Sequence, residues 1–334
     1  MKMVFKSAQG RRLRSAAGAM LALSMIARGV TGGTAFATPL LGADLASFTV
    51  LGGSTVTNVP TSAIVGNVGV WSSGGANAIT GFNASPGVAV SDPQVTAGTV
   101  QAGTSTGSPN AMTAQLQLTG AINSLGTLGT GTLEPADLSG LTLQPGVYTV
   151  PAGTTNLSGT LTLDGNGNAN AAWVFQLPST LITSPDAVVA LSNAGAGAGV
   201  YWNVGSSATL DTGTTFVGNI LARGSITLNS GATDLCGRAL AQTAVTLQEN
   251  SLSGSCLGVP AGSGAGSAGV SGGLAVGSSG GVSVLPYASV PEPSTLSMLI
   301  LGLIGVAFAA RTRREKAVTP EFALRRGVEE LGQR

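Results

Sequence analysis

Apolar and polar residues alternate in three successive stretches that begin at Ser207, and the alternation itself repeats. The stretches read SATLDTGTTFVGNILARG, SITLNSGATDLCGRALAQT and AVTLQENSLSGSCLG, and they place Thr209, Thr227 and Thr246 in register at intervals of 18 and 19 residues. Strict alternation is typical of half-buried β-strands. A repeat of this length predicts the stacked coils of a β-solenoid, so we expect each stretch to form one coil.

The alternation also predicts which side chains face outward. Each repeated threonine is followed by a leucine, so inward leucines would turn outward both the threonines and the polar residues two positions further on. Stacking would then produce a file of threonines beside a file of Asp, Asn and Gln. These residues form the candidate binding surface: Thr209, Asp211, Thr227, Asn229, Thr246 and Gln248.

The stretch TLTLDG at 160–165 repeats this local pattern and adds Thr162 to the candidate surface, with Asp164 outward beside it. Thr162 precedes Thr209 by 47 residues, which is not a simple multiple of the coil length. Threonine is also an ordinary strand former on exposed β-strands. The alternative that these files are only structural therefore stays open.

A helix is expected beside the coils. Residues 43–90 contain strand-like runs cut by glycine and predict the first coils, whereas residues 91–128 favour a helix that begins near Asn110, a good N-cap. The apolar side chains expected near one face of this helix are Met112, Leu116, Ile122 and Leu125. The helix would cover an apolar side of the solenoid.

Glycines and aromatic residues complete the expected coil. The glycines of the repeat are predicted to lie between short strands, where a residue without a Cβ is favoured: Gly213, Gly218, Gly224, Gly231 and Gly237. The few aromatic residues are interpreted as core or end-cap residues, with an aromatic binding platform as the alternative: Trp173, Phe175, Tyr201, Trp202 and Phe216.

Residues 1–37 are typical of an export signal. Basic residues precede an apolar segment around residues 16–27, and the small-residue sequence TAFA ends at Ala37, after which we expect cleavage. The Arg11-Arg12 pair leaves open whether export is of the Sec or the twin-arginine type. A basic tail without a signal function is the alternative.

The C-terminal part divides into three segments, residues 258–289, 290–314 and 315–334. Residues 258–289 are rich in Gly, Ser and Ala without periodicity and predict a linker. Residues 290–314 contain Pro291-Glu292-Pro293, an apolar run at 296–310, and then Arg311, Arg313 and Arg314. The run has fifteen residues, whereas a stable membrane span needs about 20, so we expect only a transient membrane segment.

This arrangement resembles the PEP-CTERM sorting domain of Gram-negative bacteria. The resemblance implies handling by a sorting protease at the membrane and a final location at the cell surface or in the exopolysaccharide matrix. The family's tail normally ends shortly after the arginines, whereas residues 315–334 follow them here. Processing of this C-terminal extension is therefore left open.

The chain has two cysteines, Cys236 and Cys256, which occupy corresponding places in adjacent coils. Stacked strands lie about 5 Å apart, which is within disulfide reach, and an exported chain meets an oxidising compartment. We predict a disulfide, with two free buried thiols as the alternative.

Charge and composition exclude several functions. Between Thr38 and Val290 there are nine acidic and two basic residues, a charge near −7, so this region cannot neutralise a row of phosphates and nucleic acid is excluded as a partner. The chain has no histidine, which removes the commonest general base and metal ligand. Asp211 and Asp234 are the remaining candidate carboxylate pair for sugar cleavage. However, Asn229 and Gln248 occupy the positions equivalent to Asp211 in the next two coils, so Asp211 is interpreted as one rung of a polar ladder. We expect no enzyme, metal or cofactor.

Several motifs follow one another in a fixed order over residues 43–252. They run from FTVLGGSTVTNVPTSAIVGNVGV through LSGLTLQPGVYTV and LTLDGNGNANAAWVFQLPSTLIT to VYWNVGSSATLDTGTTFVGNILARG and the stretches that follow. In this order they resemble the bacterial and fungal ice-binding-like family. The resemblance implies a mainly β fold: a right-handed, discontinuous β-solenoid of triangular cross-section, with a long α-helix alongside, within the domain 38–257. It also implies adsorption to ice through a flat face.

Threonine suits such a face because it carries a hydroxyl and a methyl group on a stiff side chain. Strands about 4.8 Å apart would hold water near an ice lattice repeat. The main hypothesis is therefore a monomeric ice-binding protein whose partner is the ice crystal surface. The alternative is a non-catalytic adhesin or matrix protein on the same scaffold, with exopolysaccharide as its partner.

Overall fold

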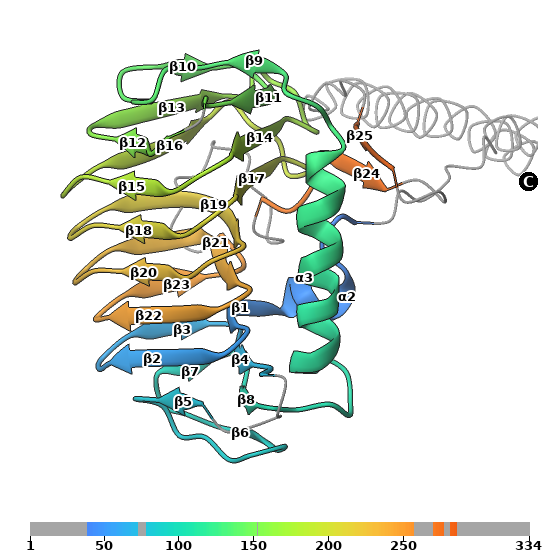
Figure 1. Cartoon of the computed structure of the whole chain (residues 1–334), viewed down its shortest axis with the longest axis vertical. Coiled ribbons are helices and arrows are strands. Elements are labelled where there is room, and N and C mark those ends of the chain that lie inside the picture. Colours follow the sequence, from blue (N-terminus) through green and yellow to red (C-terminus); the bar gives the residue numbers. More distant parts are fainter. Residues whose placement is uncertain (1–38, 73–77, 152, 257–269, 277–280, 286–334) are drawn as a thin grey trace, which may run out of the picture.

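The computed structural model describes residues 39–72, 78–151, 153–256, 270–276 and 281–285. These residues form a mainly β fold built from stacked coils of parallel strands, as expected (Figure 1). The predicted signal at 1–37, the sorting segment at 290–314 and the extension at 315–334 lie outside the described residues. No helix in the described ranges is long and apolar enough to cross a membrane.

A seven-stranded parallel sheet takes one short strand from each coil. Its strands, in spatial order, are β12 (Thr155–Leu157), β15 (Leu181–Thr183), β18 (Ala208–Leu210), β20 (Ile226–Leu228), β22 (Ala244–Gln248), β2 (Thr55–Val59) and β5 (Ile79–Thr80). The order shows that the N-terminal coil stacks directly on the C-terminal one, because β2 pairs with β22. In Figure 1 the blue strands accordingly lie beside the orange ones.

A sixteen-stranded sheet forms the rest of the coils. Its main ladder runs through β6 (Ala89–Val90), β8 (Val100–Ala102), β4 (Asn67–Val70), β1 (Phe48–Gly52), β21 (Thr233–Ala241), β19 (Thr215–Ala222), β17 (Gly199–Val204), β14 (Ala172–Leu177), β11 (Gly146–Thr149) and β9 (Thr132–Leu133). A side ladder contains β10 (Thr142–Leu143), β13 (Thr160–Asp164), β16 (Val188–Ser192), β23 (Ser251–Ser253), β3 (Ala63–Val65) and β7 (Val95–Thr96), and joins the main one through β19 and β21.

Two glycines of the repeat lie within these long strands, which corrects the expectation that all five lie between strands. Gly218 in β19 pairs with Gly237 in β21 at a shift in the register. A Cβ on Gly237 would stand 2.1 Å from the carbonyl oxygen of Gly218, so the two backbones meet where only glycine fits. Gly213 and Gly231 do lie in turns, with φ of 70° and 72°.

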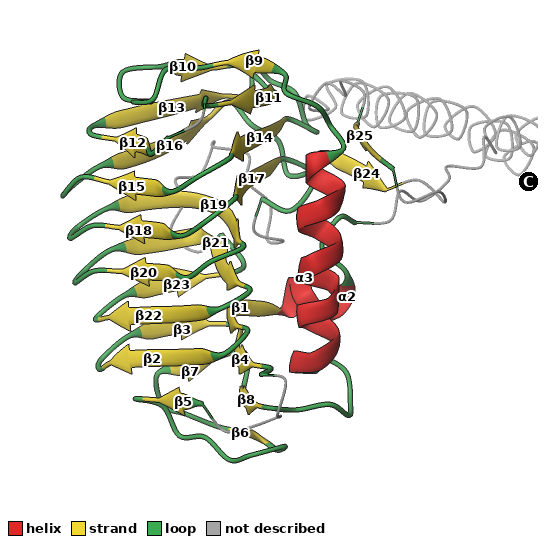
Figure 2. Ribbon diagram, in the orientation of Figure 1, coloured by secondary structure: helices red, strands yellow, loops and turns green. Residues whose placement is uncertain are grey.

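The long helix α3 (Ala111–Gly126) covers the main ladder, packing on β1, β4, β14, β17 and β19 (Figure 2). It begins where expected, because the side chain of the N-cap Asn110 accepts a hydrogen bond from the backbone N–H of Thr113 at 2.8 Å. A short helix, α2 (Ala43–Ser47), packs against it.

The buried face of α3 differs in part from the prediction. Ile122 and Leu125 are buried as expected, but Leu116 is 68% exposed. The other buried residues of α3 are three alanines, Gln115 and the fully buried Leu118. Leu116 is two positions from Leu118, and residues two apart point to different sides of a helix. The prediction weighed large apolar side chains and missed the alanines.

The core fills the inside of the coils, and a second apolar cluster lies under α3. The five aromatic residues expected in the core are all buried: Trp173, Phe175, Tyr201, Trp202 and Phe216. Phe175 and Trp202, on adjacent strands, stack with ring centroids 4.0 Å apart. The two residues are also partners in the backbone register, so the stack stabilises the pairing of β14 with β17.

Cys236 and Cys256 form the predicted disulfide. Cys236 lies in β21 and Cys256 follows β23, so the bond ties two coils at the point where the N-terminal coil begins to stack.

A final hairpin departs from the predicted division of the chain. The residues predicted as linker, 258–289, include β24 (Leu274–Val276) and β25 (Val282–Val284), which pair antiparallel beside α3 (Figure 1). Local periodicity gave no sign of it, because both strands have only three residues.

Candidate functional site

The outward residues of the seven-stranded sheet align in one file across all seven strands. From β12 to β5 the register pairs Asn156, Ile182, Thr209, Thr227, Thr246, Thr57 and Thr80. We call the five consecutive threonines of this row the threonine file. The predicted alignment of Thr209, Thr227 and Thr246 is confirmed.

Two members of the threonine file, Thr57 and Thr80, were not among the predicted residues. Their strands come near the beginning of the chain, and they join the file because the N-terminal coil stacks on the C-terminal one. The alternation in TVTNV at 55–59 was the available signal. It shows that Thr57 faces outward, but not which strand lies beside it.

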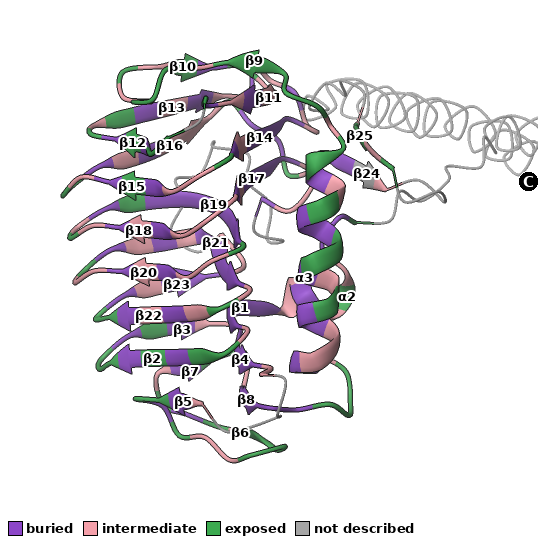
Figure 3. Ribbon diagram, in the orientation of Figure 1, coloured by how far each residue is buried: buried purple, intermediate pink, exposed green. Residues whose placement is uncertain are grey.

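The leucines that follow three members of the threonine file in the sequence point inward. Leu210, Leu228 and Leu247 are completely buried. Thr57 and Thr80 are exposed, whereas the other three threonines of the file are half-buried between neighbouring coils. Figure 3 shows this alternation as buried and exposed segments along β2 and β22.

The hydroxyl groups of the threonine file are available to solvent. Across the described ranges, none of these five side chains forms a hydrogen bond with another protein group. Hydroxyls nearby behave differently, since Ser225 and Thr243 share a hydrogen bond of 2.8 Å and Thr180 donates to Thr154 at 3.1 Å. The threonine file can therefore direct its hydroxyl groups toward water.

The sheet itself carries no charge, because its seven strands contain no acidic or basic residue. Two carboxylates flank it: Asp211 directly follows β18, and Glu249 directly follows β22. Glu249 accepts a hydrogen bond from the hydroxyl of Ser230 at 3.0 Å. At Asp211 the partner is an amide. Asn229 donates a hydrogen bond to the Oδ1 atom of Asp211 at 2.8 Å. This bond, followed by one from the backbone N–H of Thr212, lowers the pKa of Asp211 below its ordinary value, so the residue is an anion at neutral pH.

The predicted polar file beside the threonines is shorter than the threonine file. Asp211 and Asn229 are joined as a ladder, but Gln248 in β22 has Val59 as its partner in β2. Val59 is 49% exposed. The flank of the sheet thus changes from polar to apolar where the N-terminal coil begins.

Thr162 does not belong to this surface, which corrects the prediction that grouped it with Thr209. Thr162 lies in β13, where its partners are Thr142 and Ala190 in the side ladder of the sixteen-stranded sheet. Asp164, also in β13, is on the same ladder. Each coil contributes strands to more than one ladder, so a similar local sequence can fall on a different side of the solenoid.

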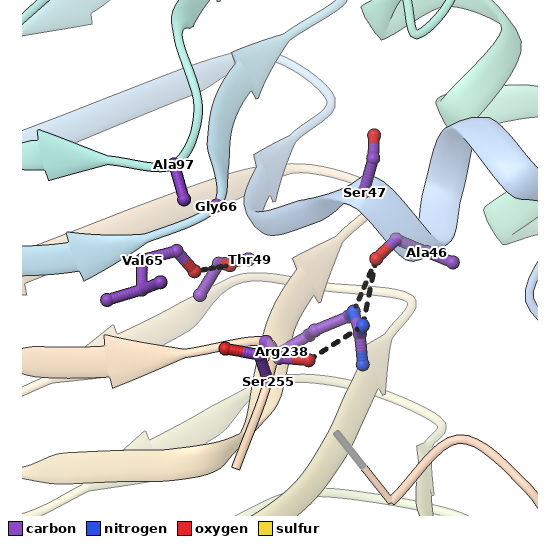
Figure 4. A pocket seen from close by; sticks show the side chains of 9 residues that line it. Ala46, Ser47, Thr49, Val65, Gly66, Ala97, Arg238 and Ser255 are labelled. Atoms are coloured by element: carbon purple, nitrogen blue, oxygen red, sulfur yellow. Dashed lines mark hydrogen bonds between the residues drawn. The ribbon is translucent and has the colours of Figure 1, made fainter. Parts of the chain in front are cut away.

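A cavity of about 360 Å³ lies at the seam between the first and last coils, lined in part by Thr49, Val65 and Arg238 (Figure 4). The guanidinium of Arg238 is already committed to the protein. It donates to the carbonyl oxygens of Ala46 and Gly254 at 2.8 and 2.9 Å, and to the Oδ1 atom of Asn219 at 2.8 Å. The cavity therefore belongs to the structural seam.

Among the described residues, no group of three or more His, Cys, Asp or Glu side chains could hold a metal ion. An uncharged sheet with hydroxyl groups free of hydrogen bonds to the described part of the protein therefore remains as the candidate site. The fold and this candidate site define a β-solenoid protein with an extended, uncharged sheet face.

The chain belongs to the ice-binding-like family, whose sequence model matches residues 50–253. An ice-binding protein from Nostoc sp. (strain HG1) is 40% identical over 273 residues, which cover 81% of this chain and 86% of that protein. The PEP-CTERM protein-sorting motif matches residues 289–314.

Solved structures of ice-binding proteins are also similar to this chain. The ice-binding protein LeIBP from an Arctic yeast, described for its antifreeze activity, superposes with a TM-score of 0.58 at 30% identity, covering 67% of this chain and 96% of that chain. An ice-binding protein from the Antarctic ascomycete Antarctomyces psychrotrophicus superposes with a TM-score of 0.53 at 31% identity, covering 64% and 97%.

Proposed function

We propose that this protein binds ice through the threonine file of its seven-stranded sheet. The observation that carries the proposal is the alignment of Thr209, Thr227, Thr246, Thr57 and Thr80 on an uncharged sheet, with hydroxyl groups that make no hydrogen bond within the described residues. The similarity to ice-binding proteins over most of the chain supports the same function.

The mechanism is ordering of water by a rigid, repeated surface. Adjacent strands hold equivalent threonines about 4.8 Å apart. The free hydroxyl groups hydrogen-bond a layer of water, and the methyl groups limit the other positions that this water can take. Each contact is weak in competition with bulk water, so affinity arises from many contacts that are already in place before the encounter.

The neighbouring residues have different roles in this proposal. Asn229 and Gln248 extend the water-binding surface at its polar flank. Asp211 marks the border, because an anion keeps its own hydration shell and does not match a neutral ice surface. Thr162 is left out because its ladder is a different one.

The finer points of the scaffold belong to the same proposal. The three ladders support a coil of triangular cross-section, and the strong preference of parallel crossover connections for one hand supports right-handed winding. Binding of this kind needs no catalysis and no cofactor. The proteins and structures compared above are ice-binding proteins, so the alternative of an adhesin or matrix spacer has no observation in its favour.

We further propose that the protein is exported and acts as a monomer at the cell surface or in the exopolysaccharide matrix. The sorting motif supports export and a surface location. In this proposal residues 1–37 are the signal, 38–257 the ice-binding domain, 290–314 the sorting segment with a transient membrane segment, and 315–334 an extension.

The test is Thr227→Tyr, with Thr215→Tyr as its matched control. Thr227 is in the middle of the threonine file, whereas Thr215 is an exposed threonine of β19 on the side ladder. We expect T227Y to need an about tenfold higher concentration for the same inhibition of ice recrystallisation, which corresponds to a loss of about 1.4 kcal/mol. T215Y should match the wild type.

Recrystallisation inhibition and thermal hysteresis measure the effect, and thermal unfolding checks that both variants fold. Equal activity in T227Y and the wild type would place the ice contact elsewhere. A wild-type protein without any effect on ice would refute the function itself.

A further inference from the structure

Residues after the last coil return to the solenoid and pair with it. The backbone N–H of Val200 donates to the carbonyl oxygen of Val270 at 2.9 Å, and that of Gly272 donates to Ala198 at 3.0 Å. Ser271 forms an antiparallel bridge with Gly199. Residues 270–272 therefore pair through their backbone with residues 198–200, at the start of β17.

Side chains of three strands hold the same segment. The hydroxyl of Tyr201 donates to the carbonyl oxygen of Gly272 at 2.9 Å, and the side-chain amide of Asn219 donates to Val270 at 3.0 Å. Arg238 donates from Nη1 to the hydroxyl of Ser271 at 2.7 Å. Tyr201, Asn219 and Arg238 are all buried, so each would lose a partner if this segment were removed.

Packing and steric fit are equally specific. Leu274 is 3% exposed and lies in the apolar cluster under α3 together with Leu118 and Tyr201. A Cβ on Gly272 would stand 2.1 Å from the carbonyl oxygen of Gly197, so close approach requires glycine here. The hairpin then closes with a bond of 2.8 Å from the N–H of Leu285 to Gly273.

We propose that residues 270–285 form an orienting anchor, which fixes the place and direction in which the C-terminal sorting segment leaves the ice-binding domain. The sorting motif begins at Ser289, four residues after Leu285. Four residues span at most about 14 Å. Without docking, the 32 residues between Cys256 and Ser289 could extend to about 110 Å, so the starting point of the sorting segment would not be fixed.

The position of the anchor gives this inference its functional meaning, which rests on the proposed ice binding. In Figure 1 β24 and β25 lie beyond α3, while the strands of the seven-stranded sheet lie on the other side of the view. A chain attached to a lipid surface through its sorting segment would therefore keep α3 toward the attachment. The threonine file would remain free to meet ice.

The test is a distance measurement between spin labels in the full chain, at Thr227→Cys and Val284→Cys, where Val284 is an exposed residue of β25. The native cysteines are joined in a disulfide, so labels react only at the introduced sites. We expect a narrow distance distribution in the otherwise native chain and an about twofold broader one after Leu274→Asp, since release of the segment creates a flexible tether. Ser283→Asp, which adds the same charge at an exposed position of β25, is the control and should leave the distribution narrow.

Gly272→Val serves as a second releasing variant that adds no charge. Hydrogen exchange of residues 270–276 measures docking directly, and we expect it to be about tenfold slower in the native chain than in either releasing variant. A broad distribution in the native chain, or a narrow one in both releasing variants, would overturn the proposal. Inhibition of ice recrystallisation in solution should be unchanged in the releasing variants, so failure of the anchor is distinguishable from failure of the ice-binding proposal.

Discussion

At the scale of single residues, the least expected group is Asp234, a carboxylic acid buried inside the coils. Its Oδ1 accepts a long bond of 3.4 Å from the N–H of Cys236, and its Oδ2 has no hydrogen-bond partner. Burial raises the pKa of Asp234 well above 3.8, and the nearby Arg238 offsets only part of this. Burial also lowers the pKa of Arg238 to about 10. Folding therefore shifts the titration of Asp234 to higher pH.

We predict that Asp234→Asn flattens the dependence of stability on pH. Because folding raises the pKa of Asp234, its contribution to stability is complete below the unfolded pKa of about 3.9 and is lost as the pH rises toward the folded pKa. The asparagine cannot ionise, so D234N should gain on the wild type as the pH increases. Urea unfolding between pH 2 and 9 would measure the difference.

Asp137→Asn is the control of opposite sign. Asp137 is exposed, and hydrogen bonds from Ser158 and Ser139 lower its pKa to about 2. Its contribution is present above the unfolded pKa and disappears as the pH falls, so D137N should approach the wild type only in acid. If D234N follows the wild-type pH curve throughout, Asp234 is not the buried titrating group.

At the scale of elements, α3 is positioned by a stripe of small residues and a few large ones. Its alanines allow the helix axis to approach the main ladder closely, and Leu118, Ile122 and Leu125 fill the remaining space. Because the opposite face carries an exposed leucine, the positions of the leucines alone do not reveal which face is buried. The alanines of α3 all lie on the buried face, so their positions indicate it.

We predict that Leu118→Ala lowers the free energy of unfolding by about 2 to 5 kcal/mol, since it leaves a cavity under α3. Leu116→Ala makes the same chemical change on the exposed face and should alter stability by less than about 0.5 kcal/mol. Equilibrium unfolding in urea compares the two variants. Similar losses in both would mean that α3 packs in a different rotation.

At the scale of the whole molecule, the solenoid depends on pairing between its N-terminal and C-terminal coils. The N-terminal strands β1, β2 and β3 pair with the C-terminal strands β21, β22 and β23, respectively. The disulfide and the hydrogen bonds of Arg238 lie at this seam. The threonine file crosses the same seam between Thr246 and Thr57.

We predict that the double variant Cys236→Ser, Cys256→Ser loses about 3 kcal/mol of stability, because the disulfide closes a loop of 20 residues and limits the unfolded chain. Thermal unfolding of the oxidised wild type and of the double variant measures this loss. Addition of a reductant to the variant controls for other effects and should change nothing. Equal melting temperatures of wild type and variant would show that the seam is held without the disulfide.

Much of the site could be read from the sequence because its signals are local. In a β-strand, alternation alone decides that Thr209, Thr227 and Thr246 face away from the leucines beside them. The similar length of the successive stretches then places these threonines in adjacent coils. The same reasoning placed Cys236 near Cys256, and the N-cap located the start of α3 at Asn110.

The tertiary structure decided what depends on contacts between distant segments. Thr57 completes the threonine file because its backbone pairs with Thr246, 189 residues later, and no local pattern specifies that pairing. Thr162 has the same alternation but falls on another ladder. Leu274 is buried in the apolar cluster under α3, and Ser271 accepts a hydrogen bond from Arg238, so both depend on contacts that only the assembled coils create. Sequence periodicity fixes the direction of a side chain relative to its own strand, whereas neighbours across the sheet are selected by the packing of the complete fold.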